Sequence, residues 1–459
     1  MAGGLSAAAA PGKEARLDEQ TAKKLSENFI ENNTIDPSYY EKYDVKRGLR
    51  NADGTGVVVG VSNISNVHGY VIDEGDKKPV QGTLTFRGYD IRDLVNRYVS
   101  TDRFGFEDIC YLLMMGELPT PEQSEYLNQV IADCRELPSG FTAEHIMNMP
   151  SDNIMNMLQR CVALLYAYDS SGKPDSLEPE HEMEVAVSLL SRLPRIAVLS
   201  YYAKRAYYYG ESMIMHRYIP GQSTAETFLS MLRPDRQYTH EEAKVLDIML
   251  MIHAEHGGGN NSTFACRTLT SAGTDAYSAY AGAIGSLKGF RHGGANIKVM
   301  QMLDDIEAHV KNWEDDGEVA DYLRKIVAKD AFDGEGLIYG MGHAVYTLSD
   351  PRAEICRYYA KELIDGTEHE PELNLLEKVA TLAPEIINEG KKVPKVVCPN
   401  VDMFSGMVYR ALGIPYDLFT PLFACSRMAG WSAHRFEEMV SGNRIMRPAY
   451  KSISTEVRI

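Results

Sequence analysis

The stretch LFTPLFACSRMAGWSAHRFEEMV, residues 418–440, is the strongest indicator of the fold. Its apolar residues recur at intervals of three and four, which places them on one face of an α-helix. These residues are Leu418, Leu422, Cys425, Ala429, Ala433, Phe436 and Val440. Gly442 and Asn443 follow, as is typical of a helix end. The stretch therefore predicts a long helix with one buried face.

Helical patterns also dominate the rest of the chain after residue 89. Residues 276–287 combine Ala, Gly and Ser with larger apolar residues, and small side chains let helices approach closely. Another stripe consists of Val299, Leu303, Ile306, Val310 and Trp313. Two short segments, 57–59 and 83–86, are β-like and follow turn-rich sequence. We therefore expect an all-α, mainly helical fold with a little β structure near residues 57–86.

Length and charge limit the class of protein. A chain of 459 residues with 44% hydrophobic residues can bury a large core, and its length suggests two or three domains. The net charge of −17 argues against nucleic acid or an anionic membrane as partner, because a basic surface steers proteins to polyanions. No apolar run reaches the ~18 residues that indicate a membrane span. Anionic substrates would therefore need specific arginines.

The cysteines and the first residues indicate a cytoplasmic protein. Seven cysteines are scattered singly and form no C-x-x-C pair, which favours reduced thiols. Residues 1–11 are rich in Gly and Ala and contain no arginine, so we expect a disordered tail rather than a presequence. Residues 170–174, 365–371 and 390–394 are polar linkers, each too short to separate independent halves.

Four glycine-rich or helix-ending segments each hold titratable groups. His256 lies where a helical run gives way to Gly257-Gly-Gly259, whereas His253 continues an apolar face and is better explained as a core histidine. The other three segments contain His292 within RHGGAN (291–296), His343 with Arg352 within GHAVYTLSDPR (342–352), and Asp402 within PNVD (399–402). Histidine and aspartate in such turns are typical of proton transfer.

Other kinds of site fit these segments less well. Three histidines and an aspartate are compatible with a metal site, but His253 and His256 lie three residues apart and no nearby ligand completes a tetrahedral set. The chain lacks a G-x-S-x-G motif, which excludes a serine hydrolase of that type. Residues 340–345 lack the third glycine of a dinucleotide fingerprint. We therefore expect neither a metal nor a bound cofactor.

Taken in order, the four segments resemble those of citrate synthases, from FRGY (86–89) to Arg447-Pro448. The resemblance implies a large helical domain, residues 51–295 and 406–459, with a smaller helical domain, 296–405, inserted in it. Residues 1–50 would form an N-terminal extension. It also implies a homodimer with shared active sites, because in the family the last arginine, here Arg447, reaches the partner subunit's site.

The resemblance assigns a role to each candidate residue. Asp402 would remove a proton from the acetyl methyl group of acetyl-CoA, and His292 would donate a hydrogen bond to the thioester oxygen. His343 would polarise the ketone of oxaloacetate. The oxaloacetate carboxylates would be bound by His256, Arg352, Arg427 and Arg447, since guanidinium groups bind carboxylates in forked pairs.

The expected contacts with CoA are Lys395 and Arg291. Lys395 matches a family position near CoA. Many relatives have a basic residue shortly after the third histidine, whereas this chain has Tyr346-Thr347. Relatives also have Pro and an apolar residue where this chain has Phe290-Arg291. Arg291 would therefore supply part of the positive charge that is missing at Tyr346-Thr347.

The leading hypothesis is condensation of acetyl-CoA with oxaloacetate to citrate. Within the family, 2-methylcitrate synthase, which uses propionyl-CoA, remains an alternative, because one methylene changes discrimination by only ~1 to 3 kcal/mol. A catalytically silent helical scaffold is the alternative from another class. Its weakness is that a scaffold has no chemical reason to keep the histidines, the aspartate and the arginines together.

Overall fold

The computed structural model of the chain describes residues 18–51, 53–74, 76–442 and 444–453. The chain forms two units, residues 1–59 with 449–459, and residues 60–448. The first contains α1 (Glu19–Asn33), α2 (Ser38–Lys42) and the short 3-10 helix η1 (Arg47–Leu49), none of which buries a residue. The tail predicted at residues 1–11 lies outside the described residues.

The second unit begins with a three-stranded antiparallel sheet of β1 (Ser65–Asp73), β2 (Asp76–Phe86) and β3 (Tyr89–Asp90), in that order. The predicted strand at 83–86 is confirmed as the end of β2. The predicted strand at 57–59 is wrong. These valines are in no strand, and Val58 remains 88% exposed. Their β propensity has no effect because none of the described strands pairs with them.

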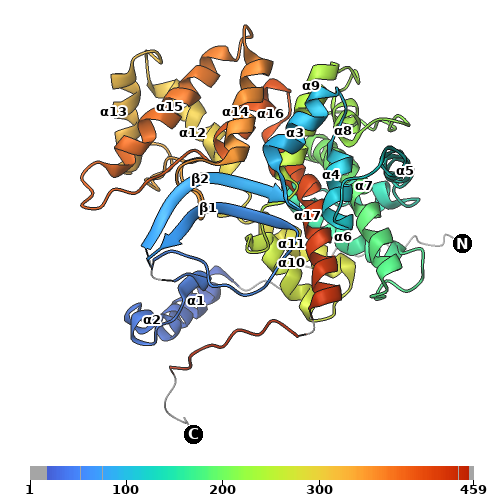
Figure 1. The fold of residues 1–459 in the computed structure, drawn as a ribbon, viewed down its shortest axis with the longest axis horizontal. Coiled ribbons are helices and arrows are strands. Elements are labelled where there is room, and N and C mark those ends of the chain that lie inside the picture. The colour runs from blue at the N-terminus through green and yellow to red at the C-terminus, as the bar shows by residue number, and fades with distance from the viewer. Residues whose placement is uncertain (1–17, 52, 75, 443, 454–459) are drawn as a thin grey trace, which may run out of the picture. The chain divides into compact units, whose positions relative to one another are not determined.

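The remaining elements of this unit are helical, which confirms the predicted fold class. The first group is α3 (Ile91–Ser100), α4 (Phe106–Met115), α5 (Pro121–Asp133), η2 (Thr142–Met147), α6 (Ile154–Leu165), η3 (Tyr166–Tyr168), α7 (Pro179–Tyr209), α8 (Thr224–Leu232), α9 (His240–His253), α10 (Asn261–Ser271), α11 (Ala276–Leu287), η4 (Tyr416–Leu418) and α17 (Phe419–Ser441). The second group is α12 (Ala295–His309), α13 (Asp316–Val327), α14 (Pro351–Ile364), α15 (Glu370–Asn388) and α16 (Asp402–Ala411). Within this unit, the second group gathers above the β1–β2 hairpin (Figure 1).

Helix α17 is central to the core and packs against α4, α7, α9 and α10. Most of its predicted apolar stripe is buried, although Val440 at its end is 78% exposed. The helix differs from the prediction of one buried face, because Ser426, Arg427 and Arg435 on its other sides are also fully buried. A helix surrounded by other helices can bury polar residues when they are paired or line a site.

The other predicted helices are largely confirmed. Helix α11 covers the predicted residues 276–287, and α12 buries Val299, Leu303 and Ile306. Helix α12 ends at His309, so Val310 and Trp313 lie beyond it. The predicted boundaries of an inserted domain at 296–405 fall inside the second unit and stay a prediction.

All seven cysteines are free thiols, and six of them are buried.

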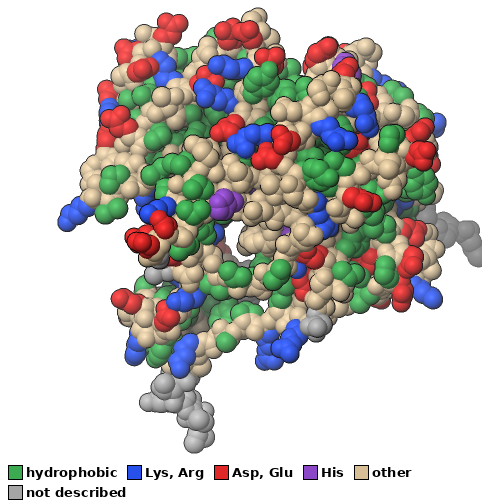
Figure 2. Space-filling model, viewed as in Figure 1, with side chains coloured by type: hydrophobic (Ala, Val, Ile, Leu, Met, Phe, Trp, Pro, Cys, Tyr) green, Lys and Arg blue, Asp and Glu red, His purple; other side chains and the backbone are tan. Residues whose placement is uncertain are grey.

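On the face of the molecule shown in Figure 2, acidic and basic side chains intermingle, and the described residues there form no basic patch. Within the described ranges, no helix combines the length and apolarity needed to cross a membrane.

Candidate active site

The first site histidine follows the end of α9. Helix α9 stops at His253, and Gly257, at φ +86°, turns the chain just after His256. Only 7% of His256 is exposed, and its Nε2 atom has no hydrogen-bond partner among the described residues. Burial lowers the pKa of His256 well below its ordinary value. His256 is therefore a neutral ring with an unsatisfied polar atom.

His253 lies in the core, as the sequence predicts, although its Nε2 atom has no hydrogen-bond partner among the described residues. It is 1% exposed, its Nδ1–H donates to the Met249 carbonyl at 2.7 Å, and its ring packs edge-on against Phe423. Burial lowers the pKa of His253 to about 3. The carbonyl oxygen of His253 accepts a hydrogen bond from Arg427 Nε at 2.7 Å, so this turn also supports a site arginine.

His292 lies in the turn between α11 and α12. Its Nε2 accepts a hydrogen bond from the Ser262 backbone N–H at 3.3 Å and lies 3.0 Å from the Ser262 hydroxyl. Because a backbone N–H can only donate, Nε2 is unprotonated and the proton of the neutral ring is on Nδ1. Burial lowers the pKa of His292 to about 4, so at neutral pH the ring is an uncharged Nδ1–H donor.

His343 is also oriented by backbone N–H groups, which here belong to its own loop. Its Nδ1 accepts hydrogen bonds from the backbone N–H groups of Val345 at 3.1 Å and Tyr346 at 3.2 Å. In the neutral ring the proton is therefore on Nε2. The loop is tied to the Asp402 loop, because Gly342 N donates to Cys398 O and the Asn400 side chain donates to Gly342 O, both at 2.8 Å.

Asp402 is the first residue of α16, and its backbone N–H donates to the Asn400 side chain at 2.9 Å. Desolvation in the cavity raises the pKa of Asp402 to about 6, although the charge of Arg352 opposes this. A carboxylate with a pKa near neutrality is ionised at pH 7 yet basic enough to accept a proton from carbon.

Two buried guanidinium groups face the same space. Arg352, in the first turn of α14, is 4% exposed and bonds through Nε and Nη2 to Asp350 at 3.1 and 2.7 Å. Arg427, in α17, is fully buried, and its Nη1 and Nη2 atoms have no partner in the described part of the chain. Burial lowers the pKa of Arg427 to about 10. Unpaired buried N–H donors are costly, which indicates that an anion normally satisfies them.

The structure brings six predicted site residues into one cavity of about 140 Å³. Its lining is His256, Asn260, His292, Gly293, Asn296, His343, Arg352, Asn400, Val401, Asp402, Phe419, Thr420, Phe423 and Arg427. Drug-sized ligands occupy ~300–1,000 Å³, so this cavity suits a small polar molecule. Sequence reasoning assigned no role to Asn260, Asn296 or Asn400, although Asn296 and Asn400 stand in the motifs it used and Asn260 directly follows Gly259.

The other three predicted residues do not line this cavity. Arg447, Lys395 and Arg291 are exposed, and Arg291 lies over the ring of Phe290 at 5.4 Å. The CoA contacts of Lys395 and Arg291 stay predictions, as does the reach of Arg447 into a partner subunit's site.

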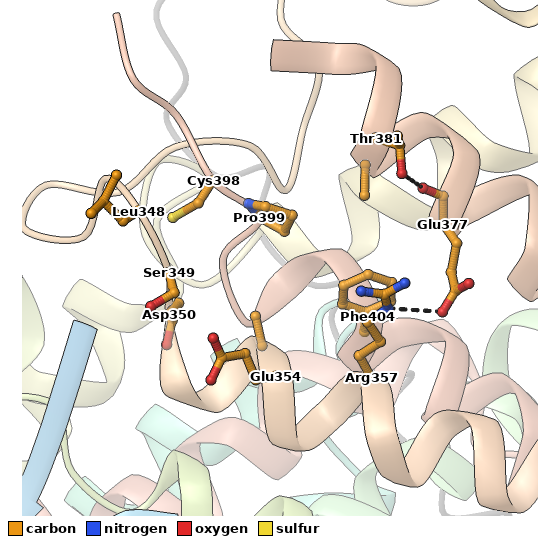
Figure 3. A pocket seen from close by; sticks show the side chains of 12 residues that line it. Leu348, Ser349, Asp350, Glu354, Arg357, Glu377, Thr381, Cys398, Pro399 and Phe404 are labelled. Atoms are coloured by element: carbon orange, nitrogen blue, oxygen red, sulfur yellow. Dashed lines mark hydrogen bonds and ion pairs between the residues drawn. The ribbon is translucent and has the colours of Figure 1, made fainter. Parts of the chain in front are cut away.

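A second cavity of about 280 Å³ lies between α14, α15 and the residues around Pro399 (Figure 3). Asp350, Glu354 and Cys398 contribute to its wall, and an Arg357–Glu377 ion pair of 2.8 Å closes one side. Burial raises the pKa of the Cys398 thiol to about 12, so it is no nucleophile at neutral pH. Cys398 therefore adds no nucleophile to the site.

The arrangement combines a base with two directed N–H donors beside an anion-binding pocket. Such a site can remove a proton from carbon next to a carbonyl group and stabilise the resulting negative charge. In the ranges that the structure describes, no three His, Cys, Asp or Glu side chains are grouped to hold a metal ion.

Comparison with known proteins identifies the relatives of this chain. Residues 51–449 match the family described as citrate synthase, C-terminal domain. Citrate synthase 2 of Bacillus subtilis is 34% identical over 396 residues, 86% of this chain and 93% of that protein. 2-Methylcitrate synthase 1 of Corynebacterium glutamicum is 31% identical, over 89% of this chain and 96% of that protein. The crystal structure of citrate synthase from Thermotoga maritima superposes with a TM-score of 0.69, at 27% identity, and covers 90% of this chain and 98% of that one.

Proposed function

The chain belongs to the citrate synthase family, and from that premise we propose that it condenses acetyl-CoA with oxaloacetate and water to give citrate and CoA. The observation that carries the proposal is the set of buried, unpaired nitrogens of Arg427 and His256 in one cavity with the base Asp402. A small dianion supplies the acceptors that Arg427 lacks, and the carboxylate provides the base for the acetyl methyl group.

In the proposed mechanism, Asp402 takes a proton from the methyl group while His292 Nδ1–H donates to the thioester oxygen. The methyl carbon then attacks the ketone carbon of oxaloacetate, and His343 Nε2–H gives its proton to the new alkoxide. The proton that Asp402 took from the methyl group then returns the His343 imidazole to its neutral form. Water finally cleaves the thioester and releases CoA with a free thiol. Each preorganised donor or proton transfer contributes on the order of 10²- to 10³-fold in rate.

We propose that Arg352, Arg427 and His256 bind the carboxylates of oxaloacetate. Arg447 would come from the partner subunit of a homodimer, which is consistent with its absence from the cavity of its own chain. The seven free thiols support a cytoplasmic location. We also propose that neither a metal nor a bound cofactor takes part.

The acyl group of the CoA thioester distinguishes citrate synthases from 2-methylcitrate synthases. Relatives of both specificities are about 30% identical to the chain, which does not separate them. Free thiol released from acetyl-CoA and from propionyl-CoA, with oxaloacetate present, measures the preference. We expect a higher kcat/KM for acetyl-CoA. A higher value for propionyl-CoA would make the protein a 2-methylcitrate synthase, and no thiol from either would favour the scaffold.

The pH dependence of the reaction follows from Asp402. Because its pKa is raised to about 6, the base becomes protonated as the pH falls through that value. We expect kcat/KM for acetyl-CoA, at saturating oxaloacetate, to fall about tenfold per pH unit below pH 6. His292, with a pKa of about 4, stays neutral in this range. Rates measured from pH 4.5 to 8 check this, and a constant rate down to pH 5 would contradict Asp402 as the base.

A further inference from the structure

Tyr346 lies directly on one of the site histidines. The two rings of Tyr346 and His343 are stacked, with centroids 4.7 Å apart and planes at 26°. Tyr346 also meets His256 edge-on at 5.6 Å, and His256 meets His343 edge-on at 5.0 Å. Tyr346 is completely buried. The three rings therefore form a packed cluster in which Tyr346 covers one face of His343.

The β1–β2 hairpin anchors this cluster. The Tyr346 hydroxyl donates to the backbone carbonyl of Thr83 in β2 at 3.1 Å. Three residues further on, the Ser349 hydroxyl accepts from Gly82 N–H at 3.0 Å and donates to the Gln81 side chain at 2.7 Å. The segment 346–349 is thus fastened to β2 at both of its ends.

Two glycines allow the hairpin to come this close. A Cβ atom on Gly82 would lie 2.0 Å from the Ser349 carbonyl oxygen and 2.8 Å from Tyr346 Cδ1. A Cβ atom on Gly69 would lie 2.9 Å from the Val345 carbonyl oxygen. Neither glycine has a positive φ, so space rather than backbone conformation requires glycine at both positions. Close backbone approach of this kind is a recognised use of glycine in strands.

We propose that Tyr346 is a positioning residue for His343, and that the β1–β2 hairpin holds His343 in place through it. The inference rests on the proposed function, in which His343 Nε2–H acts on the ketone of oxaloacetate. The stacked ring fixes the plane of the imidazole, while the Val345 and Tyr346 N–H groups fix its rotation. With both its plane and its rotation fixed, the His343 Nε2–H donor is preorganised for the ketone oxygen.

Two substitutions at Tyr346 separate the ring from the hydroxyl. Tyr346→Phe keeps the stacked ring and loses only the hydrogen bond to Thr83, so we expect kcat to fall by less than about tenfold. Tyr346→Leu removes the ring face, and a misplaced donor costs on the order of 100-fold in kcat. The KM for acetyl-CoA should stay near wild type in both variants, because Tyr346 lies among His256 and His343 rather than beside His292.

A second pair of variants tests the hairpin and leaves the aromatic cluster unchanged in sequence. Gly82→Ala forces β2 away from segment 346–349, so we expect the same pattern as in Tyr346→Leu, a lower kcat with an unchanged KM for acetyl-CoA. Gly60→Ala is the matched control, because a Cβ atom there meets nothing within 4 Å and its φ is compatible with alanine. Gly60→Ala should retain wild-type kcat.

The measurements are thiol release for both kinetic constants and circular dichroism for folding. Wild-type kcat in Tyr346→Leu or in Gly82→Ala would overturn the inference while the proposed function stands. Equal losses in Tyr346→Phe and Tyr346→Leu would overturn the role of the stacked ring, because the hydrogen bond from the hydroxyl to Thr83 would then carry the whole effect. A wild-type protein that releases no thiol would overturn the proposed function itself, and this inference with it.

Discussion

Asp402→Ala is expected to lower kcat by about 10²- to 10⁴-fold while oxaloacetate binds nearly as tightly as to the wild type. The reason is that Asp402 acts on the methyl proton of the second substrate, whereas Arg352, Arg427 and His256 hold the first. Asp402→Asn should behave alike, because the amide keeps the shape and loses the basic oxygen. Thiol release measures kcat, and calorimetry with oxaloacetate alone measures binding.

The control for this prediction is Asp321→Asn. Asp321 is a surface carboxylate, 74% exposed, that pairs with Arg324 at 2.7 Å, and such exposed pairs contribute little. We expect wild-type kcat in this variant. If Asp402→Ala weakened oxaloacetate binding as much as it slowed turnover, Asp402 would belong to the oxaloacetate pocket, and the assignment of the base would be wrong.

The sequence predicted most of the site because local signals mark it. Gly257 and Gly342, both at φ near +87°, flank His256 and His343, and this backbone conformation favours glycine whatever the rest of the fold does. The sequence alone therefore predicted turns beside His256 and His343. Helix α17 was readable for a similar reason, since its three-and-four spacing is a local property.

Long-range contacts were not readable in this way. The proton positions on His292 and His343 depend on which backbone N–H each ring meets, and for His292 that group belongs to Ser262, 30 residues earlier. The carbonyl that supports Arg427 belongs to His253, 174 residues away. The valines at 57–59 show the opposite error, a local β signal that no partner strand supports.

The contact between Tyr346 and the β1–β2 hairpin joins the two domains that the sequence predicts. The hairpin belongs to the predicted large domain, and residues 346–349 belong to the predicted insertion at 296–405. If oxaloacetate closes one predicted domain on the other, the hydrogen bonds between segment 346–349 and β2 would form or break during that motion. His343 would then reach its working orientation only with the hairpin in contact.

Arg435→Met is expected to destabilise the fold by about 3–5 kcal/mol, because it leaves a buried carboxylate without its partner. Arg435 in α17 and Glu182 in α7 are both 0% exposed, and the guanidinium bonds to both carboxylate oxygens at 2.7 and 2.5 Å. Arg435 also donates to the Thr270 hydroxyl and to the Thr274 carbonyl at 3.0 and 2.9 Å. The pair thus joins two core helices.

Urea unfolding followed by circular dichroism measures the loss in free energy of unfolding. Arg324→Met is the control, because it removes an arginine from an exposed ion pair. Arg324 pairs with Glu389 at 3.0 Å on the surface, where the two side chains are 46% and 42% exposed, so its loss should cost less than about 1 kcal/mol. Adding Glu182→Leu to Arg435→Met removes the orphaned charge, so the double variant should recover much of the loss. A double variant no more stable than Arg435→Met would show that the lost hydrogen bonds to Thr270 and Thr274, rather than the unpaired carboxylate, carry the destabilisation.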